Sequence, residues 1–337
     1  MNNNNPTRST TLVDLLHHGA QAQPDKTAYT DSIAIIGIGC RFPKAKNPSE
    51  FWQLLKHGMD AIIKVPTSRW MPTDASVPWG GFIDDVDQFD PAFFGISPRE
   101  VRSMDPQQRL LLEVGWEALE NAGVAVDSLA SSRTGVFVGI WQRDYHYYLS
   151  SVGANLYFET GNSFSVVANR LSYLWDLHGP SKAVDTASSS SLVALHDACQ
   201  SLRLGECDLA LAGGANLMLH PGVTDRFSAS RMLSPEGRCK AFGAGADGYV
   251  QGEGCGMVAI RRLEDALEGG DRILAVILGS AVNQDGRTNG LAAPNSRAQQ
   301  AVIHQALPMP GWWPRKSAMS RPMAPVRRSA TAPNSMP

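Results

Sequence analysis

The chain has 337 residues, of which 43% are apolar, and its formal net charge at pH 7 is −2. This length and apolar content are enough to bury one large core or two modest ones. The lack of a basic excess argues against a nucleic-acid partner, and no apolar run approaches the length of a membrane span. Residues 1–6 also lack the charged and apolar regions of a secretion signal, so we expect a cytoplasmic protein.

Residues 1–31 form the first of four segments that differ in character. Within them, residues 7–29 make a short amphipathic stretch that Pro24 ends. This stretch resembles the opening of a fatty acyl-AMP ligase, whose body is then missing because a different pattern begins at Ser32. An ordinary amino-terminal helix or docking segment is the alternative.

The second segment, residues 32–262, alternates apolar runs with helical patterns. Most of the runs that are typical of strands are bounded by Gly, Pro or Asp, and they occupy residues 33–38, 134–139, 183–186, 209–213 and 257–260. Helical patterns occupy residues 107–122 and 191–203. One more apolar run, residues 273–282, lies in the third segment, residues 263–307. Such alternation predicts a layered α/β fold.

The run from Val184 to Ala194 reads as a strand that feeds a small-residue turn and then a helix. Apolar residues recur at helical spacing until Gly205, namely Leu192, Leu195, Cys199 and Leu202. We therefore expect Ser188 at the amino-terminal end of a helix, where the dipole and free backbone N–H groups suit a nucleophile. On this segment alone, a serine-rich helix cap is the alternative.

Nine further motifs lie in order along the chain, at residues 33–43, 93–100, 104–113, 169–173, 212–216, 231–240, 246–250, 252–254 and 282–286. With the Ser188 run they resemble, over roughly residues 32–307, the ketosynthase domain of modular type I polyketide synthases. The resemblance implies a thiolase-like fold of two similar halves. By that comparison residues 32–262 supply an essentially complete amino-terminal half, and residues 263–307 only begin the carboxy-terminal half.

The resemblance also implies a function, that of a β-ketoacyl synthase. Such an enzyme transfers an acyl group to an active-site residue and then condenses it, with decarboxylation, with a malonyl-type extender on an acyl carrier protein. The implied partners are that carrier protein and a second copy of the chain, and no cofactor or metal is implied beyond the phosphopantetheine that carries the substrates. Exposed Phe164, Val166 and Val167 would explain the homodimer; a segment buried inside one protomer is the alternative.

Ser188 departs from the family pattern, in which this position is a cysteine. A cysteine thiol, with a pKa of about 8.5 when free, ionises more readily at a helix start, whereas a serine hydroxyl needs a neighbouring base. The two catalytic histidines of the family do not appear among the eight histidines of this chain. His196, the nearest in sequence, stands two helical turns, roughly 12 Å, beyond Ser188.

From these departures we expect a weak or inactive enzyme that does not carry out condensation. The alternative is a non-catalytic fragment that acts at most as a dimerisation or carrier-protein-binding module. A Ser-His-Asp hydrolase is not favoured, because the chain lacks the Gly-x-Ser-x-Gly elbow of that class.

Other candidate residues have more than one interpretation. The five cysteines are scattered and odd in number, which predicts reduced and mostly buried thiols, with Cys199 packed in the core. Four polar residues of the motifs have two interpretations: they line the acyl pocket or the surface that binds the carrier protein, or they only form local turns and surface charges. These residues are Lys240, Asp247, Glu253 and Asn283.

The fourth segment, residues 308–337, contains seven of the 21 prolines, five Lys or Arg, and no Asp or Glu. This composition predicts a disordered tail. Back-translation of residues 317–327, read one base earlier with permitted wobble bases, allows a sequence similar to a histidine motif of the family. We therefore interpret the segment as a frame-shifted tail, which sequencing of the coding DNA would test.

Overall fold

The computed structural model describes residues 31–307 except residues 75, 153–155 and 292. Within these ranges one mixed sheet has the strand order β5-β4-β6-β7-β1-β8. Its strands are β1 (Ile33–Arg41), β4 (Thr134–Gly139), β5 (Ser181–Val184), β6 (Leu209–Asn216), β7 (Gly254–Arg262) and β8 (Ala275–Ile277). A separate antiparallel pair joins β2 (Ile62–Lys64) to β3 (Trp79–Gly81).

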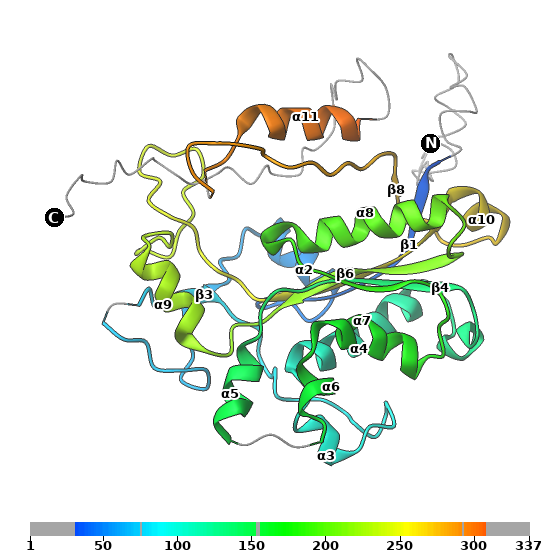
Figure 1. Ribbon diagram of the computed structural model, residues 1–337, viewed down its shortest axis with the longest axis horizontal. Coiled ribbons are helices and arrows are strands. Elements are labelled where there is room, and N and C mark those ends of the chain that lie inside the picture. The colour runs from blue at the N-terminus through cyan, green and yellow to red at the C-terminus, as the bar shows by residue number, and fades with distance from the viewer. Residues whose placement is uncertain (1–30, 75, 153–155, 292, 308–337) are drawn as a thin grey trace, which may run out of the picture.

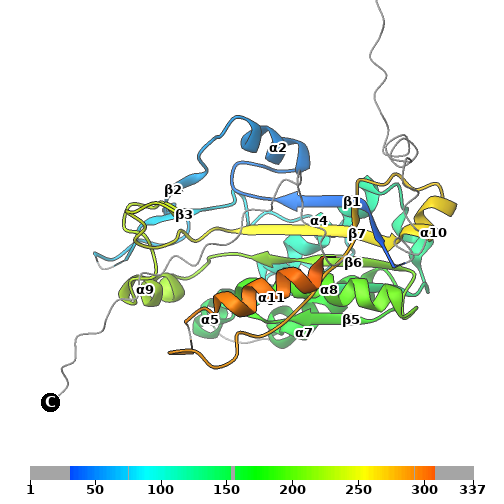
Figure 2. The ribbon, with the colours of Figure 1, turned by 90° about the horizontal axis from the view of Figure 1, so that it is seen from above.

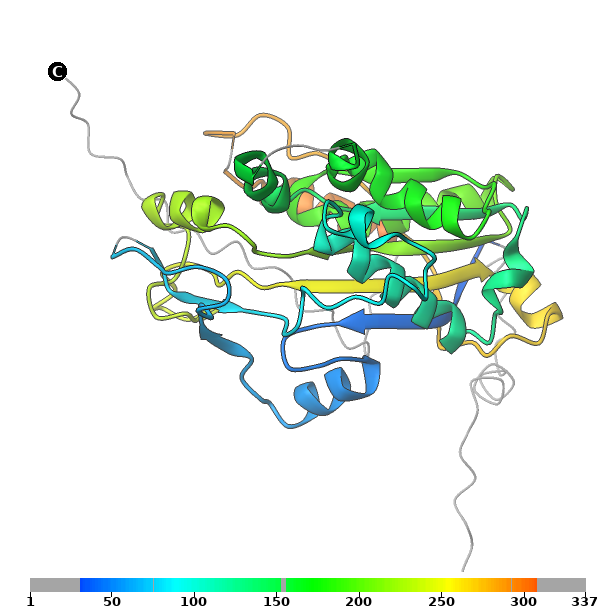
Figure 3. The same cartoon turned by 90° about the horizontal axis from the view of Figure 1, so that it is seen from below.

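The helices cover both faces of the sheet. One face carries α8 (Ser190–Arg203), with α11 (Ser296–Ala306) in a further layer above it (Figure 1). The other face carries α4 (Pro106–Asn121) and α7 (Phe164–Leu174), which lie in front of the sheet when it is seen from below (Figure 3). Shorter helices surround these layers, namely α2 (Pro48–Lys56), α3 (Pro98–Val101), α5 (Asp144–Val152), α6 (Phe158–Asn162), α9 (Pro221–Ala229) and α10 (Leu263–Glu268).

The strand directions bring several loops to one edge of the sheet. Strand β4 is parallel to both β5 and β6, while β7 runs antiparallel to β6 and to β1. The carboxyl ends of β4, β5 and β6 therefore lie together, beside the start of β7. Figure 2 shows β6 and β7 side by side. In open α/β sheets ligands bind at this edge, so the loops after these strands are the candidate location of a functional site.

The alternating side chains of β4 show why the sheet needs helices on both faces. Val136 and Val138 belong to the core beneath α4 and α7, whereas Phe137 points to the opposite core beneath α8. Successive strand residues face opposite sides, so a fully apolar strand must be covered twice. All six residues of β4 are buried, and the layered α/β fold predicted from the sequence is confirmed.

Most predicted elements lie where the patterns placed them, with two corrections. The run at residues 273–282 forms a strand only at Ala275–Ile277. The helical pattern at residues 191–203 is confirmed as α8, whose buried face is made by Ala194, Ala198, Cys199 and Leu202 while Leu192 is 70% exposed.

The second correction concerns the residues that were expected to be exposed for dimerisation. Val167 is only 2% exposed, and Phe164 packs against the core below the sheet. Val166 is half-buried as well. The expectation of three exposed side chains is therefore wrong, because α7 turns this face toward α4 and the sheet within one protomer.

No helix among the described residues is both long enough and apolar enough to cross a bilayer. The ligase-like stretch at residues 7–29 and the proline-rich segment 308–337 lie outside the described residues. The predicted divisions of the chain at residues 31, 262 and 307 stay predictions. Strand β8, which follows the second of these boundaries, joins the same sheet as β1.

Candidate active site

Ser188 lies in a tight turn at the carboxyl edge of the sheet. The turn follows β5 and forms one 3₁₀ turn, η3 (Ala187–Ser189), before α8 begins at Ser190. The sequence predicted Ser188 at the helix start, and the structure places it two residues earlier. The amino-terminal end of α8 is still directly adjacent, so its dipole favours negative charge near this turn.

Ala187 gives the turn its shape. Its φ angle is +54°, which lies in the left-handed region that residues with a Cβ rarely adopt. Its N–H donates to Asp185 Oδ1 at 3.1 Å, which supports this conformation. Strained backbone of this kind persists only where the surroundings hold it, and it clusters at functional sites.

Two glycines allow the turn to sit against the ends of the strands. A Cβ on Gly139, the last residue of β4, would lie 2.4 Å from the backbone nitrogen of Ser191. A Cβ on Gly214 in β6 would lie 2.6 Å from the carbonyl oxygen of Gly139 and 3.1 Å from the Ser191 side chain. Only glycine therefore permits this close approach of α8 to β4 and β6.

The Ser188 side chain is exposed and has no activating partner in the described part of the chain. Its hydroxyl makes no hydrogen bond there, whereas the hydroxyls of Ser189 and Ser190 both bond within the turn. A serine hydroxyl is a weak nucleophile unless a base takes its proton. The turn presents the side chain of Ser188 but does not activate it.

The described histidines have contacts of their own. His196 was the nearest candidate in sequence, and its Nδ1 lies 2.8 Å from Ser280 Oγ, on the side of α8 that meets residues 278–280. The other contacts are His57 with the Gln53 carbonyl, His146 with the Phe158 ring, His178 with Asp176 and His220 with the Gly222 N–H. None of these contacts connects a histidine to Ser188.

The cysteines do not offer a displaced nucleophile. Cys199 is fully buried, and burial raises the pKa of its thiol to about 11, so the prediction that it packs in the core is confirmed. Cys40, Cys207 and Cys255 are buried too, and Cys239 is exposed. A thiol reacts as its thiolate, which a buried apolar site disfavours.

The other polar motif residues make contacts with protein groups rather than with Ser188. Lys240 Nζ pairs with Asp247 Oδ2 at 2.9 Å, and Asn283 donates to the Ala298 carbonyl at 2.7 Å. Glu253 is buried and accepts from the N–H groups of Ile83 and Met218. The contact between Lys240 and Asp247 matches the interpretation as local turn and surface charge, whereas Glu253 is buried and joins segments that lie far apart in the sequence.

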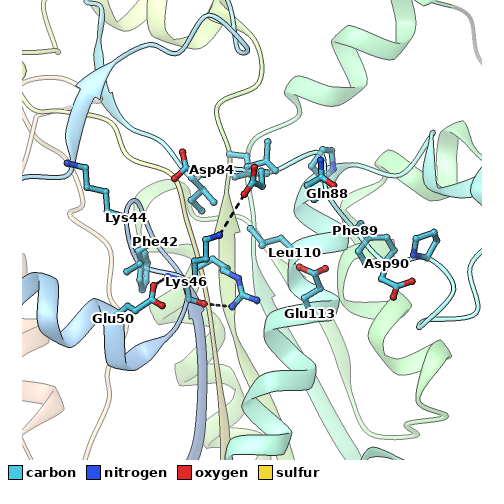
Figure 4. Close-up of a pocket in the computed structure, with 18 residues that line it drawn as sticks. Phe42, Lys44, Lys46, Glu50, Asp84, Gln88, Phe89, Asp90, Leu110 and Glu113 are labelled. Atoms are coloured by element: carbon cyan, nitrogen blue, oxygen red, sulfur yellow. Dashed lines mark hydrogen bonds and ion pairs between the residues drawn. The ribbon is translucent and has the colours of Figure 1, made fainter.

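A cavity of about 720 Å³ lies elsewhere on the molecule, between the loop after β1, residues 83–91 and the first turns of α4 (Figure 4). Lys46 and Asp85 form an ion pair across it, and Arg41 is held by Glu117. None of its lining residues belongs to η3 or α8. The cavity is therefore separate from the Ser188 turn.

Comparison with known proteins identifies the family to which the chain belongs. Residues 30–266 match the family model of the β-ketoacyl synthase amino-terminal domain, and residues 274–316 match that of the carboxy-terminal domain. Solved ketosynthases have the same fold. A ketosynthase of module 6 of the bacillaene synthase from Bacillus subtilis 168, a cysteine-to-serine mutant, superposes with a TM-score of 0.76 at 41% identity, over 82% of this chain and 48% of that one.

An oxazolomycin ketosynthase domain from Streptomyces albus JA3453 gives a TM-score of 0.77 at 42% identity, over 82% of this chain and 50% of that one. The chain belongs to the β-ketoacyl synthase family, and its fold is the thiolase-like fold of the ketosynthases. One component of the phenolphthiocerol/phthiocerol polyketide synthase of Mycobacterium tuberculosis H37Rv is 52% identical over 296 residues, or 84% of this chain and 19% of that protein. A second component of the same synthase, from the same strain, is 50% identical over 303 residues, or 86% of this chain and 16% of that protein.

The chain thus spans about half the length of these solved ketosynthases and less than a fifth of these polyketide synthase components. The resemblance to polyketide ketosynthases predicted from the motifs is confirmed. The resemblance of residues 7–29 to a fatty acyl-AMP ligase stays a prediction.

Sequence reasoning missed the parts of the site that depend on backbone geometry. Nothing in the pattern indicated that Ala187 adopts a left-handed conformation, since alanine does not signal it. Gly139 carried a usable signal, because it directly ends a buried apolar strand. A glycine in that place often marks a close approach of another backbone segment.

Proposed function

We propose that the Ser188 turn is the acyl-accepting site of a polyketide-type β-ketoacyl synthase. In such a site the nucleophile attacks a carrier-bound thioester, a new acyl bond forms at position 188, and the carrier thiol leaves with the proton. Condensation with a decarboxylating malonyl-type extender follows. The natural substrates would be acyl and malonyl-type thioesters on an acyl carrier protein.

We propose further that the 337-residue chain itself does not complete this sequence. The observation that carries this proposal is the exposed Ser188 hydroxyl, which has no hydrogen-bond partner among the described residues. Acyl transfer would be slow without a base, and the enolate formed by decarboxylation would have no imidazole to stabilise it. The family membership therefore supports the reaction class, and the residues present argue against condensation by this polypeptide.

A homodimer is part of the proposal, and strand β5 supports it. In the described sheet β5 pairs with β4 on one side and forms the edge on the other. An unpaired strand edge is a template for pairing with a second copy of the same chain. Because only two residues separate β5 from η3, pairing there would place two Ser188 turns near the same interface.

The test is acyl labelling of the full chain with a hexanoyl N-acetylcysteamine thioester, read by intact mass and peptide mapping. We expect the Ser188→Cys variant to gain one acyl group at position 188. The unmodified chain should react there about 100-fold more slowly or not at all, and Ser188→Ala should show no label at this position. A Ser188→Cys variant that stays unlabelled at position 188 while Cys239 reacts would contradict the proposed site.

A further inference from the structure

The serine run that carries the nucleophile position contains one buried hydroxyl that spans the turn. Ser190 is 5% exposed. Its Oγ accepts a hydrogen bond from the Thr186 N–H at 2.9 Å and donates one to the Ala187 carbonyl at 2.6 Å. The same hydroxyl thus holds the backbone on both sides of the Ala187 Cα.

These two bonds act where the backbone is strained. A φ of +54° at Ala187 is unfavourable for a residue with a Cβ, so the conformation depends on contacts that stabilise it. The Thr186 N–H and the Ala187 carbonyl flank the left-handed residue. Because Ser188 follows Ala187 directly, a change in this conformation would change where the Ser188 side chain points.

The neighbouring serines do not share this role. Ser189 is exposed, and its Oγ bonds only to Thr186, at the carbonyl and at Oγ1. Ser191 is exposed as well, and its Oγ makes no hydrogen bond among the described residues. Ser191 contributes instead through its backbone, which lies against Gly139.

We propose that Ser190 is the positioning residue of this site, because its hydroxyl fixes the Ala187 conformation and so aims the side chain at position 188. The inference rests on the proposed function of Ser188 and extends it to a residue that does not itself touch substrate. A nucleophile that must meet a thioester carbon is sensitive to small displacements, since misplacement by 1 Å costs large factors in rate. The hydroxyl of Ser190 supplies orientation, and the amino-terminal end of α8 supplies the favourable field.

The test measures the reactivity of a thiol placed at position 188. The background is the full chain with Ser188→Cys and Cys239→Ser, which removes the exposed native thiol. Alkylation by iodoacetamide is followed at position 188 by mass spectrometry between pH 5 and 9. The limiting rate reports access and orientation, and the midpoint reports the pKa of the introduced thiol.

We expect Ser190→Ala to lower the limiting rate about five- to tenfold and to move the midpoint to higher pH, because the thiolate loses its place at the end of α8. Ser190→Thr, which keeps the hydroxyl, should restore both values. Ser191→Ala is the matched control and should change neither. A merely structural role for Ser190 would lower thermal stability without moving the midpoint.

One further variant keeps the test decisive if Ser190→Ala does not fold. Ala187→Gly removes the penalty of the left-handed conformation, so Ala187→Gly combined with Ser190→Ala should fold. Compared with Ala187→Gly alone, this double variant should still show the reduced rate and the shifted midpoint, because glycine adopts φ values of either sign and the Ser190 hydroxyl is still needed to hold the positive one. Unchanged alkylation in a folded Ser190→Ala or double variant would overturn the proposal.

The outcome is separable from that of the proposed function. Alkylation needs no thioester, carrier protein or condensation chemistry. If Ser190→Ala did not change alkylation at position 188, the acyl-labelling result would therefore be unaffected. Failure of acyl labelling would likewise leave the alkylation comparison valid.

Discussion

Glu253 and Arg69 form a buried ion pair at the edge of the sheet that carries the Ser188 turn, with Arg69 Nη2 3.1 Å from Glu253 Oε2. The Glu253 carboxylate also accepts from the N–H groups of Ile83 and Met218. Burial raises the pKa of Glu253, although Arg69 and the backbone donors oppose that rise. One carboxylate thus ties together the segment after β3, the segment after β6 and the start of β7.

Removal of this carboxylate should be strongly destabilising. Glu253→Leu leaves the buried Arg69 charge without its carboxylate, with only the Ile83 carbonyl as acceptor, and leaves two backbone donors unpaired. We expect this to lower the free energy of unfolding by about 3–5 kcal/mol. Urea denaturation measures the change. The matched control is Lys46→Ala, which breaks the exposed ion pair with Asp85 and should cost less than about 1 kcal/mol. Equal effects of the two substitutions would contradict the structural role of Glu253.

A second prediction concerns Gly139, where β4 lies close to α8. Gly139→Ala places a Cβ 2.4 Å from the Ser191 nitrogen, so the backbone of the turn must shift. We expect a loss of about 2–4 kcal/mol in stability and slower acylation of a Ser188→Cys background. Gly245→Ala is the control, because its Cβ would meet nothing within 4 Å and its φ is not positive. A Gly139→Ala variant as stable as Gly245→Ala would show that the approach is not tight.

We expect the stability of the chain to depend on pH through Asp105. It caps α4 through the Gln107 N–H, and burial raises its pKa from 3.8 to about 6. The folded state therefore binds this proton more tightly than the unfolded state does. The contribution of Asp105 to stability is greatest below about pH 4 and falls as the pH rises through 6, by up to about 3 kcal/mol.

The Asp105→Asn variant should lack this contribution while it keeps a capping oxygen. We expect the difference in unfolding free energy between the original chain and Asp105→Asn to become less favourable to the original chain from pH 4 to pH 7. Urea denaturation at several pH values gives that difference. A difference that is constant over this range would rule out the raised pKa.

We expect the chain to self-associate through the exposed apolar side chains on the α8 and α11 side of the molecule. Helix α11 has no buried residue, and Ile303 on it is 53% exposed. Further exposed apolar side chains on residues 274–291 are Leu274, Leu278, Val282 and Leu291. Exposed apolar surface of this extent favours association or aggregation.

We expect Ile303→Ser to reduce the apparent mass of the chain in size-exclusion chromatography with light scattering. Leu267→Ser on α10, at the same 53% exposure, is the control and should have little effect. A chain that is monomeric at all concentrations would show that this surface does not drive association.

The sequence predicted the layers of this fold well, because buried strands and amphipathic helices leave a periodic signal. The run at residues 134–139 is a strand from end to end, and the pattern at residues 107–122 is α4 to within a residue at each end. The spacing of Leu192, Leu195, Cys199 and Leu202 identified a helix, but such spacing does not say which of these side chains are buried, and Leu192 is exposed. The prediction that Phe164 and Val167 are exposed was wrong because exposure depends on tertiary packing, which the sequence pattern does not show.

The site was predictable in its location but not in its geometry. Ser188 stood out as the residue between a strand and a helix, and the structure places it in that turn. The left-handed conformation of Ala187 and the two hydrogen bonds of the Ser190 hydroxyl depend on the path of the backbone, which composition does not show. The role of Ser190 could not be predicted, because residues 188–191 are all serine and only the structure shows that Ser190 alone of the four is buried.

Whether the chain carries out condensation can be measured with the purified 337-residue chain and acyl and malonyl carrier proteins, with ketoacyl product detected by mass spectrometry. We expect no ketoacyl product above the rate without protein. Sustained formation of ketoacyl product by the chain, abolished by Ser188→Ala, would contradict the claim that this polypeptide presents the acyl-accepting turn of a ketosynthase without the means to complete its reaction.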